Sequence, residues 1–78
     1  KLLVENSLAG VMLDRFGKDV MFVPADEKHF TVNVKVHVSR QFLGWVFSLG
    51  EHVKIIGPDE VLEQMRMEAK RLVAQYSE

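Results

Sequence analysis

Four polar side chains occupy every second position of one stretch of the sequence. Residues 30–38 read FTVNVKVHV, in which apolar and polar residues alternate without interruption. Such alternation predicts a β-strand with its apolar side chains on one face and its polar side chains on the other. The polar row offers hydrogen bonds and one fixed positive charge, and it consists of Thr31, Asn33, Lys35 and His37. It can face water alone, or it can bind an anion, a nucleic acid or another protein.

Three histidines, His29, His37 and His52, are the side chains that could hold a metal ion. Preformed metal pairs have short local spacings, and no two of these histidines have one. The chain has no cysteine, so a thiolate site is excluded as well. We therefore expect no metal and no cofactor, with His37 and His52 exposed to solvent on strands.

Catalytic signatures are missing from the sequence. It contains no nucleophile elbow, no P-loop and no dinucleotide-binding fingerprint. Its carboxylates are scattered over turns and the last predicted helix, without a spacing that would bring two together as an acid and a base. We expect no enzymatic activity.

Composition limits the domain count and the partners. Seventy-eight residues with 47% hydrophobic content suffice for one core. Ten basic and eleven acidic residues give a net charge of −1, which offers no general attraction to nucleic acid or membrane. No apolar run approaches the length of about 20 residues that a membrane span needs. We expect a soluble, cytoplasmic single domain, residues 1–78, excised from a longer protein because it begins at Lys1 without a methionine.

Hydrophobic periodicity and cap residues predict the secondary structure. Ser39 is placed to cap a helix N-terminus, while Gly17 and Gly50 lie where helices commonly end. The predicted order is a strand at 1–5, a helix at 8–16, strands at 19–23 and 30–38, a helix between Ser39 and Gly50, a strand at 52–56 and a helix at 59–76.

This order, β-α-β-β-α-β with an added C-terminal helix, is the α+β arrangement called ferredoxin-like. In that fold two helices cover one sheet face, and the first and third strands lie at its centre. We expect Val32, Val34 and Val36 to pack against the helices, with Phe30 and Val38 less buried. The polar row would then lie on the open face of the sheet.

The fourth strand should add two basic side chains to the same open face. The predicted ligand-binding patch therefore comprises Thr31, Asn33, Lys35, His37, His52 and Lys54. It would take a small anionic effector or a nucleic-acid end, more tightly below about pH 6.5 as histidines protonate. Solvation of this face by water alone is the competing interpretation.

Trp45 and Phe47 lie on the second predicted helix, about 200° apart around its axis, so they cannot both face the same core. Either one of them is an interface residue, or the last helix covers the outer one. We expect a homodimer or a close contact with another domain through this surface.

Residues 38–76 carry a resemblance to a known family. The segments FLGWVFSLG at 42–50 and VKIIGP at 53–58, with the closing helix, resemble the C-terminal extension (WCX) of bacterial WYL-domain transcriptional regulators. Trp45, Gly50 and Pro58 match in kind and spacing, and the N-terminal half fits in pattern. The resemblance implies a regulator in which a helix-turn-helix binds DNA, a WYL domain senses a ligand, and this extension serves effector sensing and subunit contacts.

Two functional hypotheses follow from these patterns. The first is a regulatory domain of such a regulator, with DNA bound by a separate N-terminal domain and not by these residues. It would act by a population shift, in which an effector favours one packing of subunits or domains. The alternative is a stand-alone small-molecule-binding module of ferredoxin-like fold.

Overall fold

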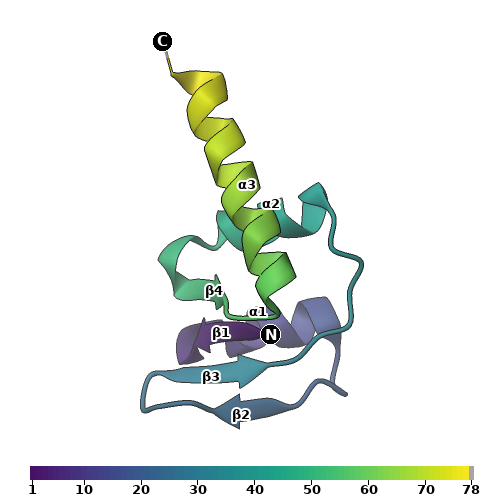
Figure 1. Cartoon of the computed structure of the whole chain (residues 1–78). Coiled ribbons are helices and arrows are strands. Elements are labelled where there is room, and N and C mark those ends of the chain that lie inside the picture. The colour runs from purple at the N-terminus through teal and green to yellow at the C-terminus, as the bar shows by residue number, and fades with distance from the viewer. Residues whose placement is uncertain (78) are drawn as a thin grey trace.

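A computed structural model describes residues 1–77. The elements follow in the order β1 (Leu2–Glu5), a 3₁₀ turn η1 (Asn6–Leu8), α1 (Ala9–Phe16), β2 (Phe22–Pro24), β3 (His29–Val32), α2 (Arg40–Ser48), a second 3₁₀ turn η2 (Gly50–His52), β4 (Val53–Ile55) and α3 (Asp59–Tyr76). Figure 1 shows this arrangement, with α3 extending away from the rest of the molecule. Within residues 1–77 no helix is both long enough and apolar enough to cross a membrane.

The four strands form one antiparallel sheet in the order β2-β3-β1-β4. The first and third strands are central, as the sequence predicted. Leu2 lies opposite Val32 on one side and Ile55 on the other, so these three residues share a sheet face. The predicted α+β, ferredoxin-like class with an extra C-terminal helix is confirmed.

The core lies between one face of this sheet and the helices α1 and α2. Every second residue of β1, β3 and β4 is buried, and α1 and α2 supply the buried helical side chains. The buried residues are Leu2, Val4, Met12, Phe30, Val32, Phe42, Leu43, Val46, Val53 and Ile55. No residue of α3 is fully buried, although Val61, Leu62 and Met65 pack against the core from its first two turns.

Predicted cap residues define the ends of α1 and α2. The Ser39 hydroxyl accepts a hydrogen bond from the main-chain N–H of Phe42 at 3.2 Å, which satisfies one of the unpaired donors of the first turn. Gly17 and Gly50 adopt positive φ angles of 85° and 65°, and Gly17 donates to the Leu13 carbonyl at 2.8 Å. All three positions behave as the sequence predicted.

The prediction of one long strand over residues 30–38 is wrong, because β3 ends at Val32 and residues 33–39 have no regular structure. β1 and β2 both stop pairing at this point, since Leu2 and Phe22 lie opposite Val32. Past Val32, the chain leaves the sheet to reach α2. Phe30 is therefore fully buried, Val34 is half-buried and Val36 is exposed, which corrects the predicted burial at both ends.

The other element boundaries shift by smaller amounts. β2 begins at Phe22 instead of residue 19 and includes Pro24, which the sequence placed after the strand. β4 covers Val53–Ile55, and His52 belongs to the preceding 3₁₀ turn. The Gly57–Pro58 peptide bond is cis and immediately precedes α3.

Candidate functional site

The open sheet face carries one row of side chains across all four strands. Thr31 lies opposite both Val23 and Leu3, and Leu3 lies opposite Lys54. Thr31 and Leu3 are half-buried, whereas Val23 and Lys54 are exposed. This face is therefore more apolar than the alternation of β3 alone suggested.

The six residues of the predicted binding patch do not come together. Thr31 and Lys54 share the row described above, but His52 lies beyond the Glu5 end of the sheet. Asn33, Lys35 and His37 lie past Val32, at the opposite end, because they follow the end of β3. The predicted patch is therefore divided among three places: His52 at one end of the sheet, Thr31 and Lys54 in the row across it, and Asn33, Lys35 and His37 past its other end.

A carboxylate accompanies His52 at its end of the sheet. His52 Nδ1 lies 2.5 Å from Glu5 Oε2, and its Nε2 lies 3.6 Å from Glu51 Oε1. The hydrogen bond to Glu5, helped by the charge of that carboxylate, raises the pKa of His52 above its usual value. His52 is thus partnered by acids and does not present a free cation to an anionic ligand.

The pairing of Glu5 with His52 was not expected from the sequence. Period-2 alternation places Glu5 on the same face as Leu3, and the central position of β1 brings it beside the start of β4. Side-chain alternation along β1, combined with the strand order of the ferredoxin-like fold, was the signal that could have identified the Glu5–His52 pair.

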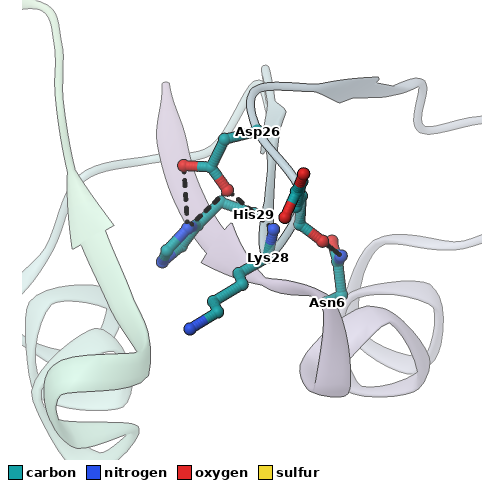
Figure 2. Close-up of polar contacts among 5 residues, drawn as sticks. Asn6, Asp26, Lys28 and His29 are labelled. Atoms are coloured by element: carbon teal, nitrogen blue, oxygen red, sulfur yellow. Dashed lines mark hydrogen bonds and ion pairs between the residues drawn. The ribbon is translucent and has the colours of Figure 1, made fainter.

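The turn between β2 and β3 is fixed by a second histidine–carboxylate pair (Figure 2). His29 Nδ1 lies 2.9 Å from Asp26 Oδ1, which also accepts the main-chain N–H of Lys28 at 2.7 Å. The hydrogen bond from His29, followed by that from Lys28, lowers the pKa of Asp26. Asn6 ties this turn to η1 through its side-chain amide, which donates to the Glu27 carbonyl at 3.0 Å. These contacts give His29 a structural role.

At the opposite end of the sheet lies a cleft of about 480 Å³, here named the valine cleft. It lies between residues 34–38, the end of β4 and the start of α3. Its apolar walls include Val34, Val36, Val38, Phe42, Ile55 and Val61. Lys1, Lys35 and His37 line the same cleft, so two members of the predicted polar row border a concave site and not a flat sheet face.

Trp45 and Phe47 point in different directions, as their spacing requires. Trp45 is half-buried; its ring meets Phe16 edge-on at 5.6 Å, and the Arg15 guanidinium lies 4.8 Å from its centroid. The side chain of Phe47 is 68% exposed. The expectation that the last helix covers the outer aromatic residue is therefore wrong for Phe47, and a role for either residue in an interface remains a prediction.

The apolar stripe of α3 continues past the point where the helix leaves the core. Val61, Leu62 and Met65 pack against the core, but Val73 and Tyr76 are 68% and 77% exposed. A groove of about 440 Å³ lies beside the first half of α3, and Phe47 and Met65 are among the residues that line it. Two exposed apolar side chains of α3 and one of α2 are here grouped under the name α3 stripe: Val73 and Tyr76 of α3, and Phe47 of α2.

An ion-pair network joins α3 to the start of α2. Glu68 Oε1 lies 2.5 Å from Arg40 Nε, and Glu68 Oε2 lies 2.9 Å from Arg71 Nε. The hydrogen bond from Arg71, followed by that from Arg40, lowers the pKa of Glu68. The network orients the middle of α3 while leaving its apolar stripe uncovered.

Within residues 1–77 no three histidine, cysteine or carboxylate side chains gather closely enough to hold a metal ion. The fold and surfaces together define a ferredoxin-like domain with an appended helix whose apolar stripe is only partly packed. A family model described as "WCX domain" matches residues 1–73, and the chain belongs to this family. The resemblance to the WCX extension is confirmed, and membership is consistent with a regulatory domain. No curated protein and no solved structure matches.

Proposed function

We propose that the protein is the C-terminal regulatory domain of a bacterial transcriptional regulator. It works without catalysis, by changing how subunits or domains pack, and DNA is bound by a separate N-terminal helix-turn-helix. Membership of the WCX family supports this class. The observation that carries the mechanism is the α3 stripe, where large apolar side chains stay exposed beside a groove.

The partner that α3 fits best is a second copy of the same domain. Its first half (residues 59–67) carries Asp59, Glu60 and Glu63 against Arg66, a net charge of −2, whereas its second half (residues 68–76) carries Lys70 and Arg71 against Glu68, a net charge of +1. Two copies of α3 packed antiparallel would therefore place the net-negative half of each helix beside the net-positive half of the other while covering both apolar stripes. A contact of this kind is isologous, so each favourable interaction occurs twice.

Such a dimer gives the domain a way to regulate. An effector that binds one packing arrangement better than another shifts the population toward it and so changes the spacing of the attached DNA-binding domains. Contact of the same stripe with the WYL domain of its own chain is the second arrangement that would serve this mechanism.

Sedimentation of the protein tests the dimer. We expect the unaltered chain to dimerise and Val73→Asp to weaken the dimer roughly 100-fold, because one valine side chain per copy would be lost from the contact. Ala74→Asp is the matched control, since it introduces the same charge one residue away on the polar face of α3. A strict monomer, or equal weakening by both variants, would contradict the homodimer.

The coding sequence upstream of these residues tests the wider proposal. We expect it to encode a helix-turn-helix followed by a WYL domain. An upstream catalytic domain would instead favour the alternative of a small-molecule-binding module, for which the valine cleft offers a site.

A further inference from the structure

We infer that the valine cleft binds a small amphipathic anion, with an apolar body between the valines and a carboxylate or similar head at Lys35 and His37. This deepens the proposed function by naming a ligand class for effector sensing. The inference does not depend on the α3 stripe, because the valine cleft is lined by Pro58 and Val61 at the start of α3 and by none of the residues of that stripe.

The size and walls of the cleft suit a small ligand. Its volume of about 480 Å³ lies within the range of roughly 300–1,000 Å³ that small-molecule sites occupy. Val34 and Val38 are half-buried and Val36 is 37% exposed, so apolar side chains line the cleft without filling it. An apolar ligand body would remove this surface from water.

The charges around the cleft specify the head group. Lys1, Lys35 and His37 are the ionisable residues that line it, and within residues 1–77 no carboxylate does. Asp59 and Glu60 begin α3 nearby but are exposed outside the lining. Because the whole chain carries a net charge of −1, a concave site with only basic side chains is a local feature that selects an anion.

The segment that forms one wall is able to adjust around a ligand. Residues 34–38 have no regular structure and lie outside the paired strands, and within residues 1–77 none of their main-chain groups bonds to another main-chain group. Their N–H groups therefore remain available to a carboxylate. The opposite wall is fixed, since the Lys1 carbonyl accepts from Ile56 at 2.9 Å and the Lys1 main-chain nitrogen donates to Gly57 at 2.7 Å.

Titration with octanoate, followed by amide resonances, tests the proposal. We expect saturable one-to-one binding that shifts residues 34–38 and Val61. Hexanoate should bind about 15-fold more weakly, because each methylene contributes a factor of about four, and neutral 1-octanol should bind more weakly than octanoate.

Two matched variants locate the head group. Lys35→Gln should weaken octanoate about two- to five-fold, as expected for a partly exposed ion pair. Lys54→Gln removes another exposed lysine, from the open sheet face, and should leave the affinity unchanged.

Three results would overturn the proposal that the valine cleft binds an anion. These are no saturable binding of octanoate, equal affinity for octanoate and 1-octanol, and a larger loss of octanoate affinity from Lys54→Gln than from Lys35→Gln. The last result would place the anion on the open sheet face. Sedimentation of the same samples separates this test from the test of the dimer. A protein that binds octanoate but stays monomeric would support the proposed site in the valine cleft and contradict the proposed dimer through the α3 stripe.

Discussion

Truncating two valines of the FTVNVKVHV stretch tests where β3 ends. Val32 is 1% exposed and lies opposite both Leu2 and Phe22, whereas Val36 is 37% exposed and lies outside the sheet. Replacement by alanine removes two methyl groups from either residue. An uninterrupted strand over residues 30–38 would bury both valines and make the two substitutions equally costly.

The structure predicts very different losses for the two substitutions. Val32→Ala should lower the free energy of unfolding by about 2–3 kcal/mol, because the transfer term for two methyl groups is about 1.6 kcal/mol and a closed core retains part of the cavity. Val36→Ala should lower it by about 0.5–1 kcal/mol, since its side chain is already partly hydrated. Against a total of roughly 4–12 kcal/mol for a domain of this size, the first loss is severe and the second is tolerable.

Urea unfolding followed by the fluorescence of Trp45 measures both losses. Trp45 is the only tryptophan and is half-buried against Phe16, so its emission reports the packing of α2 on α1. Equal losses for the two valine variants would refute the end of β3 at Val32 and restore the long strand that alternation predicts.

Three further changes test the caps and one ion pair. Ser39→Ala should cost about 1 kcal/mol in urea unfolding, because the Phe42 N–H loses its acceptor. Gly17→Ala should cost about 1–2 kcal/mol even though space is open there, since φ of 85° with ψ of 176° strains any residue with a Cβ. Because the hydrogen bond to Glu5 raises the pKa of His52, the contribution of this pair to the free energy of unfolding is complete below the usual histidine pKa of about 6.5. That contribution is lost as pH rises through the raised pKa. Glu5→Gln should therefore lower the urea midpoint more at pH 6 than at pH 8, and an equal loss at both would contradict the pairing.

The fold class was predictable because it depends on coarse features. Element order, the cap at Ser39, the helix ends at Gly17 and Gly50 and the alternation of short strands are written locally and are recovered in the structure. Asn6 and Ser7, which are also typical N-cap residues, instead form a 3₁₀ turn and do not cap α1. Ser39 and Gly17 illustrate this, since a cap needs only its own helix to be recognised.

The composition of the site was less predictable, because it depends on where pairing stops. Alternation continues through Val38, but a strand needs neighbours, and both β1 and β2 stop pairing opposite Val32. The consequence for function is large. Lys35 and His37 move from a flat face to the border of a cleft, while His52 joins Glu5 at the other end of the sheet.

The stripe of α3 shows the same limit at the level of packing. Periodicity identifies which side of a helix is apolar, but it does not say what covers that side. The 18 residues of α3 span about 27 Å, and only its first two turns pack against the core, through Val61, Leu62 and Met65. Val73 and Tyr76, in the second half of α3, are exposed, and Figure 1 shows that this part of the helix projects away from the rest of the molecule. A polar overhang would need no explanation, whereas an overhang that carries apolar residues at core spacing is the surface for which we propose a partner.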